Sequence, residues 1–130
     1  MGYSPIEDSD EALGKRVLDA AFMVHSKLGP GLLESVYERC LKLELQRANV
    51  PAASQVILPI NYGGEVIESG LRLDLWVGKR VVVELKAVES LLPIHEAQLF
   101  TYLKLTGCRL GFLLNFNVEH MKEGIRRVVR

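Results

Sequence analysis

Asp74, Glu84 and Lys86 are the residues whose types and spacing could carry out chemistry on a charged substrate. Glu84 and Lys86 interrupt VVVELKA, Val81–Ala87, a run rich in β-branched residues that is typical of a buried strand. Side chains two positions apart in a strand point to the same face, so Glu84 and Lys86 form a local pair. The simpler alternative for such a pair is a strand near a sheet end whose charges reach water.

The register of a hairpin decides whether Asp74 joins this pair. Alternation in LRLDLWV predicts two opposite faces, with Leu71, Leu73, Leu75 and Val77 on one and Arg72, Asp74 and Trp76 on the other. Asp74 lies opposite Glu84 only if the turn is centred on Lys79, which requires the three-residue loop Gly78-Lys79-Arg80 or an equivalent bulge. A two-residue turn would place the two acids on opposite faces.

Two carboxylates side by side would favour a bound cation. They repel, raise the pKa of one another and cost stability unless a positive charge joins them. Oxygen ligands without cysteine or clustered histidine favour Mg²⁺ or Mn²⁺ over zinc, and Mg²⁺ takes few carboxylates alongside water and substrate phosphate. On the same face, Lys86 could orient or deprotonate an attacking water, or neutralise charge that grows on a phosphate.

The remaining sequence predicts the elements that must position these residues. Asp8 and Glu11 resemble a capping box at the start of a helix that Gly29 can end. Further expected elements are a helix from Leu33 to about Ala48, a strand at Gln55–Ile60, a turn at Tyr62–Glu65, strands at Val66–Val77 and Val81–Ala87, a helix from about Ile94 to Leu105, a strand at Arg109–Phe116, and a short helix followed by a strand in the tail. This order predicts an α/β fold with a mixed sheet, because a crossover helix lets the strand after it run parallel.

Composition predicts a soluble, cytoplasmic, single-domain protein. The 130 residues are 48% hydrophobic and 25% charged, which suits one domain with one core. Two cysteines without CxxC spacing indicate neither a disulfide framework nor a zinc site, and no apolar stretch is long enough for a membrane. A formal net charge of zero excludes a bulk positive field for nucleic acid. The basic tail, residues 122–130, is either a local phosphate-facing patch or an ordinary solvated surface.

Three short motifs carry a resemblance to a known group of enzymes. Asp74 followed by Glu84-Leu85-Lys86 resembles the D…ExK core of the PD-(D/E)XK, or restriction-endonuclease-like, nuclease superfamily. Gln98 and Tyr102 are similar to the QxxxY signature of its exonuclease branch, and their spacing puts them on one helix face. The segment Gly31–Tyr37, with Glu34 inside it, is similar to the motif of the GxxExxY family, a small branch of the same superfamily.

The resemblance implies a fold and a site. The fold would be one restriction-endonuclease-like domain over residues 1–130, with helices flanking a central mixed sheet in the order αα-βββ-α-β. It implies metal ligation by the side chains of Glu34, Asp74 and Glu84 and the carbonyl of Leu85, catalysis by Lys86, and Gln98 and Tyr102 lining the site. A proline usual before the motif aspartate is replaced by Leu73.

The implied activity is Mg²⁺- or Mn²⁺-dependent hydrolysis of phosphodiester bonds in DNA or RNA. The alternative is a non-catalytic nucleic-acid-binding, accessory or dimerisation module that keeps the fold. Because the chain has no overall basic charge, we expect a second copy or a partner protein to complete substrate binding.

Overall fold

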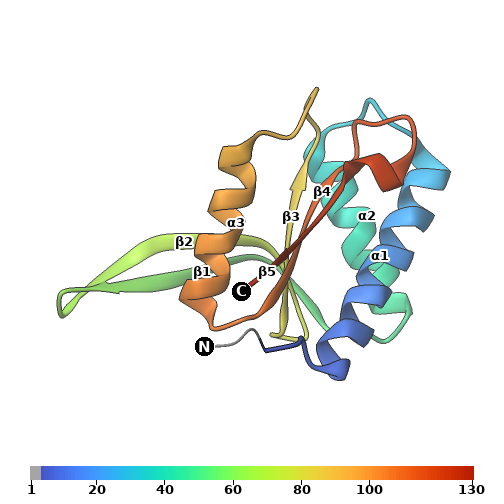
Figure 1. The fold of residues 1–130 in the computed structure, drawn as a ribbon. Helices are drawn as coiled ribbons and strands as arrows, with labels where there is room; N and C mark the ends of the chain where they lie inside the picture. Colours follow the sequence, from blue (N-terminus) through green and yellow to red (C-terminus); the bar gives the residue numbers. More distant parts are fainter. Residues whose placement is uncertain (1–3) are drawn as a thin grey trace.

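The computed structural model describes residues 4–130, which form a five-stranded sheet with helices on both faces (Figure 1). In chain order the elements are α1 (Asp8–Leu28), α2 (Glu34–Arg47), β1 (Ala52–Tyr62), β2 (Glu65–Val77), β3 (Val81–Lys86), α3 (Pro93–Thr106), β4 (Leu110–Asn115), the 3₁₀ turn η1 (Met121–Gly124) and β5 (Ile125–Val129). The strands follow one another across the sheet, and all neighbours are antiparallel except β3 and β4. The prediction of an α/β fold with a mixed sheet is confirmed.

The sheet separates two apolar cores. α1 and α2 cover one face and α3 covers the other, as Figure 1 shows. Val81, Val83 and Leu85 of β3 belong to the core under α1 and α2, whereas Val82 belongs to the core under α3. Both faces of β3 are therefore buried, which explains its continuous β-branched run.

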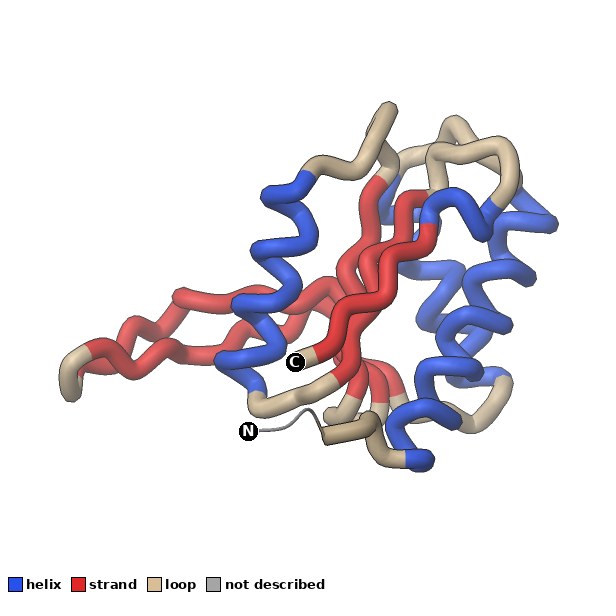
Figure 2. Tube along the Cα trace, in the orientation of Figure 1, coloured by secondary structure: helices blue, strands red, loops and turns tan. Residues whose placement is uncertain are grey.

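The hairpin of β1 and β2 leaves the sheet as a long arm (Figures 1 and 2). Leu75 packs in the core under α1 and α2, but Leu71 and Leu73 pack in the core under α3. The prediction that these alternating leucines share one face was therefore wrong. The inward side chains of β2 change from one core to the other between Leu73 and Leu75, as the right-handed twist of strands allows in a long hairpin.

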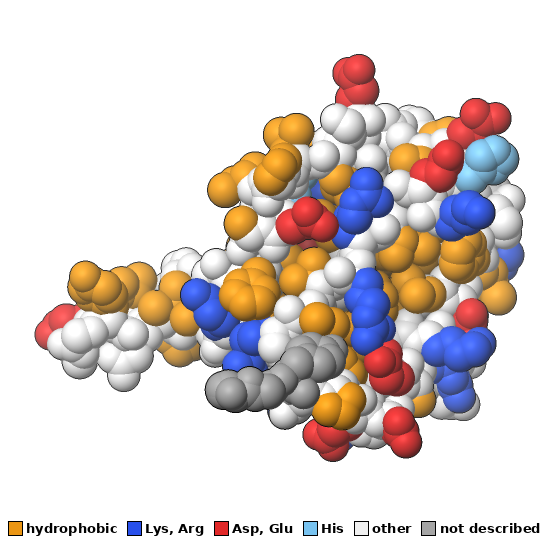
Figure 3. Space-filling model, viewed as in Figure 1, with side chains coloured by type: hydrophobic (Ala, Val, Ile, Leu, Met, Phe, Trp, Pro, Cys, Tyr) orange, Lys and Arg blue, Asp and Glu red, His pale blue; other side chains and the backbone are white. Residues whose placement is uncertain are grey.

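The arm exposes apolar side chains, which Figure 3 shows towards its outer end. All of residues 61–70 are exposed, including Tyr62, Val66 and Ile67. The turn at its tip uses Gly63 and Gly64, both with positive φ, as the sequence predicted from the Tyr62–Glu65 segment.

The first helix begins differently from the prediction. Its N-cap residue is Glu7, with no side-chain cap, so the expected capping box of Asp8 and Glu11 does not form. The acidic residues of this turn instead meet Arg80 from the β2–β3 turn, whose guanidinium pairs with Asp10 and Glu7. Tertiary ion pairs take the place of the local cap.

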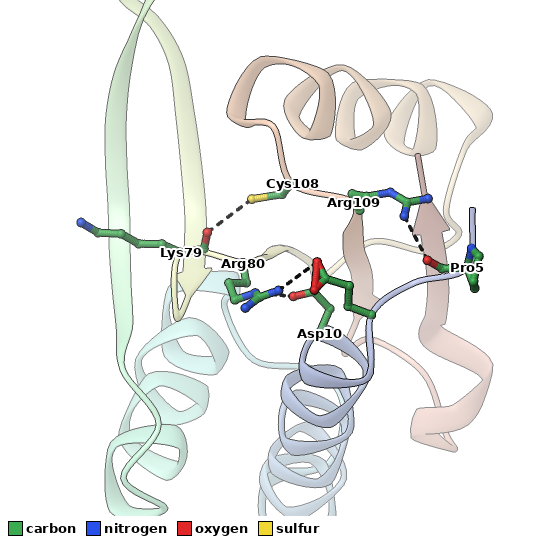
Figure 4. A network of polar contacts seen from close by, with 7 residues as sticks. Pro5, Asp10, Lys79, Arg80, Cys108 and Arg109 are labelled. Atoms are coloured by element: carbon green, nitrogen blue, oxygen red, sulfur yellow. Dashed lines mark hydrogen bonds and ion pairs between the residues drawn. The ribbon is translucent and has the colours of Figure 1, made fainter. Parts of the chain in front are cut away.

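Figure 4 shows how these contacts hold the β2–β3 turn in place. Arg80 Nε donates to the buried carboxylate of Asp10, and the Cys108 thiol donates to the Lys79 carbonyl with a sulfur–oxygen distance of 3.7 Å. Nearby, Arg109 Nη1 donates to the carbonyl of Pro5 at 3.0 Å. The turn is thus fixed to α1 and to Cys108, two residues before β4.

We expect Arg80→Ala to lower the free energy of unfolding by about 1–3 kcal/mol, because it leaves the Asp10 carboxylate buried without its partner. Urea unfolding followed by circular dichroism measures this. Lys15→Ala is the matched control, since it removes an exposed pair with Asp19 and should change stability by less than about 1 kcal/mol. Equal losses of stability in Arg80→Ala and Lys15→Ala would contradict a stabilising role for the Arg80–Asp10 pair.

Candidate metal and phosphate site

The β2–β3 turn has the register that brings the two acids together. Val77 pairs with Val81 and Leu75 with Val83, so the turn is centred on Lys79 and has a three-residue loop. Gly78 and Lys79 both have positive φ, and the Arg80 N–H donates to the Val77 carbonyl at 3.0 Å. If this register is continued by one residue beyond Leu75 and Val83, Asp74 lies opposite Glu84.

The carboxylates of Asp74 and Glu84 exchange hydrogen bonds with backbone amides across the two strands. The Asp74 N–H donates to Glu84 Oε2 at 2.9 Å, and the Leu85 N–H donates to Asp74 Oδ2 at 2.9 Å. The backbone pairing of β2 with β3 ends at Leu75 and Val83, one residue before Asp74 and Glu84. Where β2 separates from β3, hydrogen bonds from carboxylates to backbone amides therefore replace the backbone–backbone hydrogen bonds. We call this point, with Asp74 on β2 and Glu84 on β3, the fork.

Glu84 is the most perturbed acid of this site. It is only 6% exposed, and burial raises the pKa of its carboxyl to about 8, with further raising by the charge of Asp74. The Asp74 amide and the ammonium of Lys86 act in the opposite direction on this pKa. The sequence-based expectation that neighbouring acids raise one another's pKa is thus met at Glu84, although burial contributes more than Asp74 does.

Glu34 lies within electrostatic range of the same groups. Burial raises the pKa of its carboxyl first, and the charge of Asp74 raises it further. The ammonium of Lys86, the backbone amide of Ala87 and the ring of His95 lower it. The pKa of Glu34, at the start of α2, is therefore affected by charged groups on β2, β3 and α3.

Within residues 4–130, no three His, Cys, Asp or Glu side chains lie close enough to hold a metal ion by themselves. Direct ligation by Glu34 therefore stays a prediction, as does ligation by the Leu85 carbonyl; the Leu85 N–H donates to Asp74.

Helix α3 brings Gln98 and Tyr102 to the site. Gln98 Nε2 donates to the Tyr102 hydroxyl at 2.9 Å, across one helical turn. Burial raises the pKa of Tyr102, and the charges of Glu84 and Asp74 raise it further. The phenol therefore lies within electrostatic range of the two acids, with Gln98 holding it.

Tyr37 has a structural part in this arrangement. Its hydroxyl donates to the Gly29 carbonyl at 2.6 Å and accepts from the Leu32 N–H at 3.1 Å. Its ring stacks on Phe116 with centroids 4.7 Å apart. Tyr37 thus ties down the loop that leads into Glu34 and fixes where α2 begins.

Two residues near the site were not found from the sequence. Gln55 Nε2 donates to Glu38 Oε1 at 2.6 Å and also lies 3.4 Å from Asp74 Oδ1. Burial raises the pKa of Glu38, as do the charges of Asp74 and Glu34, while the Gln55 hydrogen bond lowers it. Glu38 follows Glu34 by one helical turn, which was a usable signal. Gln55 gave no such signal, because its position depends on the β1–β2 register.

The basic tail is engaged with the rest of the protein. Arg127 Nη1 and Nη2 each donate to a carboxylate oxygen of Glu11 at 2.7 Å. Arg130 Nε donates to the Cys108 carbonyl at 3.1 Å. These contacts favour the ordinary-surface interpretation over a phosphate-facing patch.

Comparison with known protein families shows which superfamily the chain belongs to. The sequence pattern of the family described as PD-(D/E)XK nuclease superfamily matches residues 11–128. The chain belongs to this superfamily, and its five-stranded mixed sheet flanked by helices is consistent with a restriction-endonuclease-like fold.

Among solved structures, the chain is similar to the one described as "Crystal structure of SSO0001". The two are 20% identical, the match covers 96% of this chain and 78% of that one, and the TM-score is 0.49. No curated protein gives a significant match.

Among residues 4–130, no helix is both long and apolar enough to cross a membrane.

Proposed function

We propose that this protein is a divalent-metal-dependent nuclease that hydrolyses phosphodiester bonds of DNA or RNA. The observation that carries the proposal is the fork at which the Glu84 carboxylate accepts the Asp74 N–H and the Asp74 carboxylate accepts the Leu85 N–H, with Lys86 two residues beyond Glu84 along β3. The buried Glu84 beside the half-buried Asp74 costs stability in the free protein, which is expected where a cation completes a site.

The donor set fits Mg²⁺ or Mn²⁺. It consists of carboxylate oxygens from Asp74 and Glu84, with the Leu85 carbonyl and Glu34 as the further proposed ligands. These donors are all oxygens, which suits Mg²⁺ better than zinc, and Mg²⁺ retains several waters and needs few protein ligands. When bound, such an ion supplies Lewis-acid activation of the phosphate and of a water molecule.

The protein's own groups supply the rest of the chemistry. Lys86 can place its ammonium against a phosphate oxygen and offset the charge that develops there in the transition state. Tyr102, held by Gln98, can donate its hydroxyl proton in a hydrogen bond to the substrate. Asp74 stays oriented throughout, because the Leu85 amide holds one of its oxygens.

Two finer assignments belong to this proposal. Gly31, Glu34 and Tyr37 support placing the chain in the GxxExxY branch, with Tyr37 shaping the loop before Glu34. A partner protein or a second copy is supported by the exposed apolar side chains of the β1–β2 arm and by the absence of Lys and Arg between residues 52 and 71, since such a surface suits protein better than phosphate. The alternative remains an accessory module that binds nucleic acid without cleaving it.

Calorimetric titration with Mn²⁺ tests the metal site, and we expect the parent to bind while Asp74→Ala does not. Cleavage is then assayed on single- and double-stranded DNA and RNA, with Mg²⁺ or Mn²⁺, using variants purified identically to exclude a contaminating nuclease. Metal binding without cleavage of any substrate would favour the accessory module. Equal Mn²⁺ binding by parent and Asp74→Ala would reject the site.

A further inference from the structure

Gln55 has an unusual backbone conformation for a residue inside a strand. Its φ is 51°, in the left-handed region, although both neighbours keep regular pairing, Ser54 with Leu75 and Val56 with Leu73. A residue with a side chain pays a conformational cost in this region that glycine does not pay. The position opposite Gln55 in the same register is Asp74.

The side chain of Gln55 reaches the acids of the site. Its Nε2 donates to Glu38 Oε1 at 2.6 Å and lies 3.4 Å from Asp74 Oδ1. The other oxygen of Asp74 accepts the Leu85 N–H. The Asp74 carboxylate is therefore held from β3 at one oxygen and approached from β1 at the other, so its plane is fixed while lone pairs remain for an ion.

A purely structural role for Gln55 would be to turn the hairpin over at this point. Glycine would serve that role at lower conformational cost, as it does at Gly63, Gly64 and Gly78, although Asn49 and Lys79 also have positive φ. What glycine cannot supply is the amide between Glu38 and Asp74. Backbone strain of this kind gathers at functional sites, and here the strained residue carries a contact to a proposed metal ligand.

We propose that Gln55 is a positioning residue, which is held by Glu38 and fixes the Asp74 carboxylate for the metal ion. The inference rests on the nuclease proposal only in taking Asp74 as a ligand. Residues that orient a ligand in this way commonly change metal affinity by about 10- to 100-fold when removed. Since the contact to Asp74 is long, we expect the lower end of that range.

Two substitutions of Gln55 separate the amide from the backbone strain. Gln55→Gly removes the amide and relieves the strain, so its melting temperature without metal should equal or exceed that of Gln55→Ala, which keeps the strain. Both variants should bind Mn²⁺ about tenfold more weakly than the parent in calorimetry. Unchanged Mn²⁺ affinity in a folded Gln55→Gly would mean that Gln55 only shapes the hairpin, and would overturn the proposal.

Substitutions of Glu38 test the other half of the contact. Glu38→Gln keeps an oxygen that can accept from the Gln55 amide, so its Mn²⁺ affinity should stay within about threefold of the parent, whereas Glu38→Ala should fall about tenfold. Equal losses of Mn²⁺ affinity in the two variants would show that the charge of Glu38 acts directly on the ion, and would contradict its role in holding Gln55. If the parent itself does not bind Mn²⁺, the nuclease proposal fails as well, and this outcome is distinct from a parent that binds and a Gln55→Gly that binds equally.

Discussion

Lys86→Ala is expected to lower the rate of phosphodiester hydrolysis by about a hundredfold or more while leaving metal binding intact. The variant removes one ammonium next to Glu84 and leaves both carboxylates in place. Since that ammonium repels a cation, Mn²⁺ affinity should be unchanged or slightly higher. Single-turnover cleavage with saturating Mg²⁺, together with Mn²⁺ calorimetry, measures both effects.

Asp74→Ala provides the contrast, because it should lose metal binding and hydrolysis together. Lys15→Ala, on the exposed surface of α1, is the matched lysine control and should keep the parent rate. Cleavage that continues at the parent rate in Lys86→Ala would remove the lysine from the mechanism, even if the metal site itself is real.

The second large effect concerns the pH dependence of stability in the metal-free protein. The pKa of the Glu84 carboxyl rises from 4.5 to about 8 on folding, so the folded state holds a proton that the unfolded state releases. The stability that the protonated Glu84 contributes is therefore fully present below pH 4.5 and is lost as the pH rises towards 8. From pH 6 to pH 8 the expected loss is about 2 kcal/mol, obtained from the cited pKa values by linkage.

Urea unfolding at several pH values in the presence of a chelator measures this loss. Glu84→Gln, which cannot ionise, should be more stable than the parent at pH 8 and should show a smaller pH dependence. A parent whose stability is flat between pH 6 and pH 8 would contradict the assignment of Glu84 as a neutral acid in the free protein.

Bound metal should offset the loss of stability that the free protein shows between pH 6 and pH 8. Binding to the folded state alone stabilises it by mass action, by about 2.7 kcal/mol at a hundredfold excess over Kd. Because the ion requires an ionised Glu84, the rise in melting temperature with Mn²⁺ should be greater at pH 8 than at pH 6, and it should be lost in Glu84→Ala.

The sequence determined most of the elements, because their signals are local. Gly29 and Gly107 follow the ends of α1 and α3, the Gly63–Gly64 pair makes the arm's turn, and the β-branched run of β3 marks a strand buried on both faces. The short helix and last strand of the tail were also predicted. The capping box was wrong, because Arg80, distant in the sequence, pairs with the acids of that turn.

The candidate site was determined only in part. Residue types and spacing picked out Asp74, Glu84, Lys86, Gln98 and Tyr102, but alternation left two registers open for the first two. The turn decided between them, since Gly78 and Lys79 adopt the positive φ that a loop centred on Lys79 uses. A slip of one residue would have separated the acids, because side chains in a strand alternate between faces.

What only the tertiary structure decided is how the acids are held. Leu73 and Leu75 pack in different cores, and the register of the β1–β2 hairpin places Gln55 opposite Asp74. Packing of α2 on the sheet brings Glu38 to Gln55, and burial in this packing raises the pKa of Glu84. Sequence patterns report local periodicity, whereas strand register, twist and burial follow from contacts between distant segments. For that reason the residues of the site could be named in advance, but the contacts and charge states that define their chemistry could not.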